Sequence, residues 1–518
     1  MNGSSPAQPM AWWRRPALAP LLLVIAYMVF GIAWVFTNPP GFAPDEPEHY
    51  VKAIGIAHGE VRGDPAPYTQ LPIVNSQMLQ WLNLSTRLVR VPAGMGACLY
   101  FRLPIDGRCP EGRPPPTPAR QPTYVASYPP FMYVGAAAAT RLGNTTTTAL
   151  LLGRLATLLQ SVALVGAAAA LLGAGRGGVL SLVGLVASVT PTSVFIFSEL
   201  SASGLEIAGG ICFAAALIRL TGDDPPPRWL WPLLLLSAVV LALSRTFGPV
   251  WVGFDVCWAV GLLGLRATRL RLRAHRGWAS ATGAILVVAI AANVAWQMAV
   301  APHPPLTLAA LRSGAGSVFG GVATLGRQLI GVFGWIDVPL PWPAYLPWAL
   351  MLALLLLGAF LVAGRRQRWV LLGVCAGIGV LTLGVAVVIA AAAPGFQMQT
   401  RYVLPAAVAL PLLAGELLRL HRAAIDGRLL AVAVPAAVLV AAAVQAWGLE
   451  VNAQYYRHNV NGYVSYITPP GWRPPLGWYP WIALSGLGCA ALAAVAFITT
   501  RQATPSPPGP TAMSQMPA

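Results

Sequence analysis

The stretch ALAPLLLVIAYMVFGIAWVF, from Ala17 to Phe36, decides the class of this protein. It contains no charged side chain, and about 20 residues of helix reach about 30 Å, the thickness of the hydrocarbon core of a bilayer. The run is long and shows no small-residue cleavage site, which favours an uncleaved anchor over a signal peptide. The stretch therefore predicts a first membrane-spanning helix.

Apolar runs of this kind recur along the chain, which is 56% hydrophobic and only 9% charged, against about 25% charged residues in a soluble domain. The sequence predicts an all-α polytopic membrane protein with about twelve transmembrane helices. The least certain orientations are those of 229–244 and 249–265, because both runs are short and SRTFG joins them. The twelve spans lie near residues 17–36, 149–172, 179–198, 205–220, 229–244, 249–265, 279–300, 345–364, 369–393, 402–418, 429–448 and 479–499.

The net charge of +17 is distributed as in a membrane protein. Most arginines fall in short loops on one side of this threading, which is the positive-inside pattern rather than the basic groove of a nucleic-acid-binding protein. We therefore expect a bilayer and no nucleic acid as partner, with both termini in the cytoplasm. A single lysine, Lys52, among 33 basic residues suggests a GC-rich bacterial source and hence a bacterial plasma membrane.

This threading divides the chain into three regions. Residues 1–16 form a cytoplasmic N-terminus, 17–499 the transmembrane domain, and 500–518 a Pro- and Ser-rich cytoplasmic tail that we expect to be disordered. The large first extracytoplasmic loop covers 37–148 and ends in a short apolar segment typical of an interfacial helix. Further outer loops cover 301–344 and 448–478.

Two cysteines, Cys98 and Cys109, lie in the first outer loop. In an oxidising compartment they are candidates for a disulfide, and free thiols are the alternative.

The first outer loop opens with NPPGFAPDEPEHYVKAIGIAHG, from Asn38 to Gly59, which concentrates ionisable residues in positions 45–52. In a helix that begins near Asp45, the side chains of Asp45, Glu48, His49 and Lys52 share one face. Such a stripe at a membrane surface suits a catalytic site. A structural alternative is a capping box made by Asp45 and Glu48, with a proline in the first helical turn.

Other ionisable residues gather at the outer face. Arginine binds phosphate through paired hydrogen bonds, a carboxylate can accept a proton from a hydroxyl, and acidic oxygens can bind Mg²⁺, Mn²⁺ or Ca²⁺. Asp255 lies within the sixth span, and we expect it to pair with an arginine such as Arg154. By contrast, Gly173, Gly175 and Gly178 match a dinucleotide fingerprint only in letters, because they link two spans rather than a strand and a helix. The outer ionisable residues outside the first loop are Glu199, Glu206, Arg245, Asp337 and Arg401.

Four motifs along the chain stand out: Pro44-Asp45-Glu46-Pro47-Glu48-His49, Tyr128-Pro129-Pro130-Phe131, Gly334-Trp335-Ile336-Asp337 followed by Leu340-Pro341, and Gln399-Thr400-Arg401-Tyr402. Together they resemble one family, the bacterial membrane proteins of domain-of-unknown-function family 2142, which looks like a branch of the GT-C membrane glycosyltransferases. Where that family has Gln-Gly-Arg-Tyr, this chain has a threonine in place of the glycine.

The resemblance implies a GT-C-like fold and an enzyme that uses a polyprenyl-phosphate-linked sugar. Asp45 would be the general base or, with Glu46, a ligand of a divalent cation, and Arg401 would hold the donor phosphate. Both carboxylates are therefore candidate catalytic residues. The candidate substrate-binding residues are His49, Lys52, Arg245, Asp337, Arg401 and Tyr402.

The predicted function is transfer of a sugar from a polyprenyl-phosphate donor to a cell-envelope glycan or lipid on the extracytoplasmic face. One alternative is a secondary transporter or flippase for an envelope precursor, although the ionisable residues favour the outer edge over the bilayer midplane where transporters bind. The other is a non-catalytic membrane scaffold, in which Asp45 only caps a helix.

Overall fold

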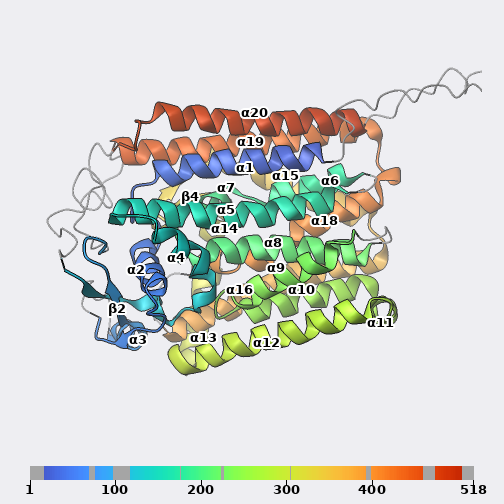
Figure 1. Ribbon diagram of the computed structural model, residues 1–518. Coiled ribbons are helices and arrows are strands. Elements are labelled where there is room, and N and C mark those ends of the chain that lie inside the picture. The colour runs from blue at the N-terminus through green and yellow to red at the C-terminus, as the bar shows by residue number, and fades with distance from the viewer. Residues whose placement is uncertain are drawn as a thin grey trace, which may run out of the picture.

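The computed structural model describes residues 17–68, 76–96, 117–174, 177–222, 227–303, 305–392, 398–458 and 473–503. The described chain is a bundle of long helices that run side by side, with a cap of shorter elements at one end (Figure 1). Cys98 and Cys109, like the predicted disordered tail beyond residue 503, lie outside the described residues, so the disulfide stays a prediction.

Eight of the described helices are long and apolar enough to cross a bilayer, which confirms a polytopic helical protein. They begin and end where charged or helix-breaking residues interrupt the apolar runs. They are α1 (Leu18–Thr37), α5 (Thr146–Gly173), α8 (Ala202–Thr221), α12 (Arg276–Val300), α15 (Trp342–Val362), α16 (Arg365–Ala392), α19 (Gly427–His458) and α20 (Tyr479–Ala503).

Two further spans are bent pairs of helices, which raises the count to ten if each pair crosses once. Helix α6 (Gly178–Ser188) meets α7 (Pro191–Phe197) at 72°. Pro191 cannot continue a helix but suits a first turn, and Thr190 caps that turn by accepting from the Ser193 N–H. Helix α10 (Gly248–Leu263) turns by 103° into α11 (Leu265–Ala274) at Gly264, whose φ of 85° favours glycine.

The predicted count of twelve spans is not confirmed. Every predicted span overlaps a helix, but α9 (Leu230–Ala242) has 13 residues and α18 (Ala409–Leu420), preceded by the single turn α17 (Leu404–Ala407), has 12. Since about 20 residues cross the hydrocarbon core, neither spans it alone. In the bundle, α1 begins and α20 ends away from the cap (Figure 1).

The first loop folds into most of the cap. Helix α4 (Val134–Thr140) is the short apolar helix expected near the end of this loop, and it packs against α5. The small antiparallel sheet β1-β2-β3, in which Arg87 pairs with Thr123 and Val91 with Ala119, was not predicted. The elements are α2 (Glu46–Ala57), β1 (Asp64–Pro65), α3 (Ser76–Ser85), β2 (Arg87–Val91), β3 (Ala119–Thr123), the 3₁₀ turns η2 (Tyr124–Ser127) and η3 (Pro130–Tyr133), and α4 (Val134–Thr140).

Later loops complete the same end of the bundle. The described residues of the 301–344 loop form two helices and a small hairpin. These elements are α13 (Leu308–Gly320), α14 (Val322–Ile330), β4 (Val332–Phe333) and β5 (Val338–Pro339); the turn η4 (Thr400–Tyr402) follows α16, and η5 (Arg422–Ala424) precedes α19.

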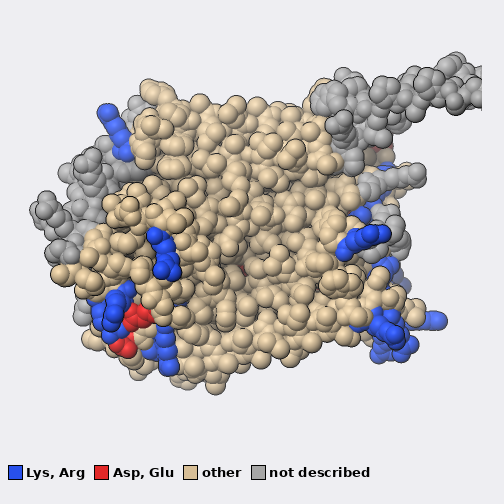
Figure 2. Space-filling view, in the orientation of Figure 1, with Lys and Arg blue, Asp and Glu red and all other residues tan. Residues whose placement is uncertain are grey.

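Charged side chains avoid the middle of the bundle surface. On the face shown in Figure 2, Lys, Arg, Asp and Glu lie at the two ends, and a broad band between them carries other residues. This band fits a bilayer in which charged groups remain at the water interfaces.

The interior nevertheless contains charges, and their pairing differs from the prediction for Asp255. Arg154 bonds Glu46 through two hydrogen bonds of 2.6 Å and lies 3.2 Å from Glu199. Asp255 instead accepts from the indole of Trp258, three residues along the same helix. The predicted Asp255–Arg154 pair was therefore wrong, because Arg154 bonds the Glu46 carboxylate at the start of α2 instead.

Candidate active site

Asp45 lies directly before α2 and joins three distant parts of the chain. Its carboxylate accepts from Arg401 at 2.6 Å and from the hydroxyl of Tyr124, and only 7% of the residue is exposed. Burial alone raises the pKa of Asp45, but the charge of Arg401 and the hydroxyl of Tyr124 hold it below its usual value. Asp45 is therefore a carboxylate whose negative charge is stabilised by an arginine.

The backbone of Asp45 has the left-handed conformation, with φ of 61°. Asp and Asn tolerate this region better than most residues, yet it costs about 1–2 kcal/mol. Although Asp45 occupies the N-cap position of α2, its side chain makes no capping hydrogen bond. The capping-box alternative therefore fails, because the strained backbone directs the carboxylate to Arg401 and Tyr124 instead.

Arg401 is held by the short turn η4 between α16 and α17. The Thr400 N–H donates to Gln328 and its hydroxyl donates to the carbonyl of Leu325, which anchors the turn on α14. The threonine that replaces the glycine of the family motif thus bonds α14, while Arg401 bonds Asp45 and the carbonyl of Pro44. The pKa of Arg401 is raised despite its burial, because Tyr402 and Asp45 favour its charge.

Arg245 brings a second positive charge to the same place from the turn between α9 and α10. It donates to the hydroxyls of Tyr128 at 2.9 Å and Ser203 at 3.1 Å. Its guanidinium also lies over the rings of Tyr128 and Tyr402, 4.8 and 4.9 Å from their centres, while Arg401 lies 5.2 Å from the Tyr402 ring. Tyr402 therefore lies against both arginines.

Arg245 is the more exposed of the two arginines. Its side chain is 15% exposed, against 8% for Arg401. Arg401 and Gln399 also line a cavity of about 20 Å³, which is enough for one water molecule but not for a phosphate ester. Of the two arginines, Arg245 is therefore the one that solvent reaches more readily.

His49 lies behind Asp45 on the first turns of α2. Its Nδ1 is 2.6 Å from the hydroxyl of Tyr133, and its ring stacks on the same tyrosine. Burial lowers the pKa of His49 to about 3, with further effects from nearby charges. A neutral imidazole beside the Asp45 carboxylate is suited to orienting neighbouring hydroxyl groups, whereas it adds no charge for binding phosphate.

Glu46 points away from Asp45, although the two are adjacent in sequence. Both of its oxygens accept from Arg154, and they also accept from the backbone N–H groups of Gly41 and Leu200. Burial raises the pKa of Glu46, but Arg154 outweighs it and keeps the carboxylate ionised. These bonds join the start of α2 to α5 and leave no Glu46 oxygen directed at the Asp45 cluster.

Glu48 and Lys52 were predicted to share one helix face with Asp45, and both contact the 123–133 segment. Each of them forms hydrogen bonds with backbone groups there. Glu48 accepts from the Tyr124 N–H, and burial raises its pKa to about 8. Lys52 donates to the carbonyls of Val61 and Ala126 and is fully buried. Lys52 thus stabilises the cap.

Asp337 belongs to a neighbouring cluster. It accepts from the hydroxyl of Tyr455 at 3.0 Å, and burial raises its pKa above the usual value. The structure thus brings Asp45, His49, Arg245, Arg401 and Tyr402 together. It places Asp337 with Tyr455, and it commits Glu46 and Lys52 to structural bonds; the roles in substrate binding remain predictions.

A divalent cation shared by Asp45 and Glu46 does not fit this geometry. Both Glu46 oxygens are occupied by Arg154, and an arginine already neutralises Asp45. Within the described ranges, no group of three or more His, Cys, Asp or Glu side chains is arranged to hold a metal ion.

Sequence reasoning missed Tyr124 as a partner of Asp45. Tyr128 stood out only as part of a motif, with no role attached. A tyrosine in a loop gives no periodic signal, and only the folded chain shows that these two residues face the buried acid and Arg245.

The fold and the cluster together define a multi-pass membrane protein with an acid–arginine site where its helices meet the cap. The sequence matches the family described as "Predicted membrane protein (DUF2142)" over residues 28–410. This match covers most of the chain, which therefore belongs to that family, as its motifs indicated.

Comparison with curated proteins found no match. Among solved structures, the chain is similar to the crystal structure of ArnT from Cupriavidus metallidurans in the apo state, with 11% identity, a TM-score of 0.40, and coverage of 93% of this chain and 76% of that one. ArnT bound to undecaprenyl phosphate gives 15% identity, a TM-score of 0.41, and coverage of 93% and 77%. A similarity at this level supports no argument about chemistry, and the GT-C assignment remains a proposal.

Proposed function

We propose that this protein is a GT-C-like membrane glycosyltransferase that moves a sugar from a polyprenyl-phosphate donor to a cell-envelope glycan or lipid. The observation that supports this most is the contact between Asp45 and Arg401, residues 356 positions apart, at 2.6 Å. With Arg245, the more exposed of the two arginines, the cluster combines one base with two phosphate-binding side chains at the end of a membrane bundle.

In the proposed reaction the donor phosphate binds Arg245 first and then Arg401. Arginine matches phosphate oxygens through paired N–H donors, and these bonds replace the one to Asp45. Loss of Arg401 as a partner raises the pKa of Asp45, because Arg401 is the main influence that lowers it. Donor binding thus turns a stabilised carboxylate into a better base.

The acceptor hydroxyl then gives its proton to Asp45 as its oxygen bonds to the anomeric carbon of the sugar. The bond from that carbon to the phosphate oxygen breaks, and the electron pair leaves with the polyprenyl phosphate. Arg245 and Arg401 stabilise the charge that develops on the leaving phosphate. Tyr128 and Tyr402 enclose the arginines and supply aromatic faces for a sugar ring.

Binding of a polyprenyl monophosphate, the product lipid of this reaction, tests the site without knowledge of the sugar. Native mass spectrometry of the detergent-purified protein should show the lipid on wild type and at least tenfold weaker binding to Arg401→Gln and Arg245→Gln. Arg312→Gln, an exposed arginine on α13, is the control and should bind as wild type. Equal binding by all four proteins would refute the proposed phosphate site.

Extracytoplasmic orientation of this end is tested separately. In a variant whose six native cysteines are replaced by alanine, a cysteine introduced at His58, an exposed position directly after α2, should react with an impermeant maleimide in intact cells. Labelling only in inverted vesicles would place the site in the cytoplasm.

A further inference from the structure

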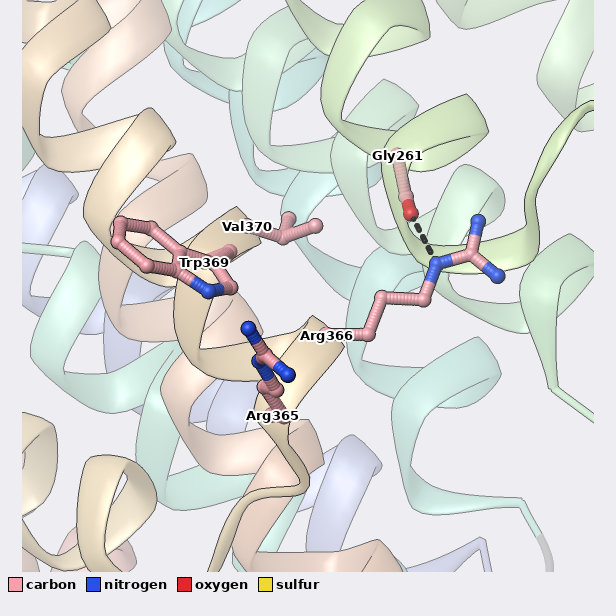
Figure 3. A pocket seen from close by; sticks show the side chains of 5 residues that line it. All are labelled: Gly261, Arg365, Arg366, Trp369 and Val370. Atoms are coloured by element: carbon pink, nitrogen blue, oxygen red, sulfur yellow. Dashed lines mark hydrogen bonds between the residues drawn. The ribbon is translucent and has the colours of Figure 1, made fainter.

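A second candidate site lies at the end of the bundle opposite Asp45. Arg245 lies three residues before α10, whereas Gly261 lies in the last turn of that helix. There the surface where α10 meets the start of α16 has a groove of about 610 Å³, lined by Gly261, Arg365, Arg366, Trp369 and Val370 (Figure 3). The groove is shallow and open to the surface.

The two arginines in this groove differ in how they are held. Arg366 donates from Nε to the carbonyl of Gly261 at 2.8 Å and from Nη1 to that of Leu263 at 3.1 Å. It thereby neutralises the negative end of the α10 dipole and is fixed in place. Arg365 projects from the first turn of α16 beside Trp369 (Figure 3) and is exposed. The groove therefore presents one guanidinium anchored on α10 and one that projects beside Trp369.

The neighbouring helix α11 indicates the depth at which this groove lies in the bilayer. It bends by 103° from α10, so it runs across the bundle axis at its end (Figure 1). None of its residues is buried. Leu265 and Leu272, seven residues apart and therefore on one face, are 68% and 41% exposed, and four other residues of the helix are arginines. A basic amphipathic helix with this orientation is typical of the membrane surface.

Tryptophan marks the same level. Trp369 in the groove is 65% exposed and Trp278, just after α11, is 45% exposed. Exposed tryptophans of membrane proteins concentrate where headgroups meet hydrocarbon. The groove thus opens sideways at the depth of lipid phosphates, with exposed apolar residues of α16, such as Leu372 and Val380, further along the helix.

We propose that this groove binds an anionic glycerophospholipid from the leaflet at the arginine-rich end. The lipid phosphate would accept from Arg365 and from the remaining N–H groups of Arg366, while one acyl chain follows the exposed apolar surface of α16. Basic pockets between helices at the membrane surface recognise headgroups in this manner. The site is separate from the Asp45 cluster and does not depend on the proposed transferase function.

Thermal unfolding of the full-length protein in detergent tests the proposal with three probes: phosphatidylglycerol, phosphatidylcholine and inorganic phosphate. Phosphatidylglycerol should raise the melting temperature of wild type in a saturable way, and the other two should not. Arg365→Gln should weaken the apparent affinity about fivefold, since one surface arginine contributes about that much to binding of an anionic lipid. Arg365→Lys should keep most of it, because the charge remains.

Arg428→Gln is the matched control, because it removes an exposed arginine at the start of α19, outside the groove, and should leave the lipid affinity unchanged. Arg365 is exposed, so its loss should not unfold the protein. The proposal is overturned if Arg365→Gln and Arg428→Gln lose affinity equally, if phosphatidylcholine stabilises as much as phosphatidylglycerol, or if inorganic phosphate reproduces the effect.

Discussion

Replacement of Asp45 by asparagine tests the proposed site most directly. Asparagine keeps the size of the side chain and the tolerance for the left-handed backbone at φ 61°, but it removes the negative charge. A general base contributes about 10²–10⁴-fold to rate, which corresponds to about 2.7–5.5 kcal/mol of activation free energy. We therefore expect sugar transfer by Asp45→Asn to fall by at least about 100-fold.

The same substitution should also lower stability, because it leaves a buried arginine without its partner. Asp45 and Arg401 are 7% and 8% exposed and lie 2.6 Å apart. Removal of one partner of a buried ion pair costs about 3–5 kcal/mol, and the amide oxygen of asparagine can still accept a hydrogen bond. A loss near the lower limit, about 3 kcal/mol, is expected in the free energy of unfolding.

A double variant separates stability from catalysis. Asp45→Asn combined with Arg401→Gln leaves no unpaired charge, so it should recover part of the lost stability but none of the activity. The matched control is Asp64→Asn, whose side chain is 65% exposed in a pair with Arg120; such pairs contribute less than about 1 kcal/mol, and its transfer rate should equal that of wild type.

The assay measures release of polyprenyl phosphate from a panel of polyprenyl-phosphate sugars by the purified protein, alongside thermal unfolding of each variant. A rate within threefold of wild type for Asp45→Asn would remove this residue from the chemistry. Strictly additive losses of stability in the double variant would show that Asp45 and Arg401 do not pair in solution.

Three further predictions concern the surroundings of the site. Burial raises the pKa of Glu48 to about 8 from 4.5, so the folded state holds a proton that the unfolded state lacks, and stability falls as pH rises from about 4.5 to about 8. Glu48→Gln should flatten this decline in melting temperature; an unchanged slope would contradict the buried, protonated Glu48. Glu46→Gln should lower the free energy of unfolding by about 3 kcal/mol, because Arg154 loses its charged partner and one of its two 2.6 Å bonds, and a change below about 1 kcal/mol in chemical denaturation would exclude this role. Treatment with EDTA should leave transfer unchanged, since the proposed mechanism uses arginines for the phosphate; loss of activity restored by Mg²⁺, Mn²⁺ or Ca²⁺ would require a cation.

The long apolar helices could be predicted from the sequence because each carries its signal locally. A run of uncharged residues identifies a span without knowledge of its neighbours, and the predicted 17–36 corresponds to α1 (Leu18–Thr37). The small sheet of the cap could not be predicted in this way. Its strands β2 and β3 are five residues each and pair across a long interval of sequence, so no local periodicity reveals them.

The site was predictable only in part, for a related reason. Family motifs drew attention to Asp45 and Arg401, but spacing cannot show which of several carboxylates an arginine will choose. Arg154 was matched with Asp255, whereas the fold gives it Glu46 and Glu199. The left-handed backbone at Asp45 also leaves no trace in residue type beyond the general tolerance of aspartate for it.

The three carboxylates around the start of α2 illustrate how one short segment acquires three different chemical states. Asp45 and Glu48 both bond Tyr124, Asp45 through the hydroxyl and Glu48 through the N–H. Glu46, between them in sequence, bonds Arg154 instead. Glu46 meets Arg154 and is ionised but inaccessible; Glu48 meets a backbone N–H without a cation, and its raised pKa keeps it protonated at neutral pH.

Asp45 alone meets an arginine that a phosphate can compete for, and Arg245, the other arginine of its cluster, is partly exposed. Glu46 is ionised but held by Arg154, and Glu48 is buried and protonated. In the proposed reaction the ionisation state of Asp45 responds to the donor, and only this property suits a base. A base that is released by donor binding also limits proton abstraction when no donor is present. Under the proposed function, Asp45 is therefore the one carboxylate of this segment that can act as the base.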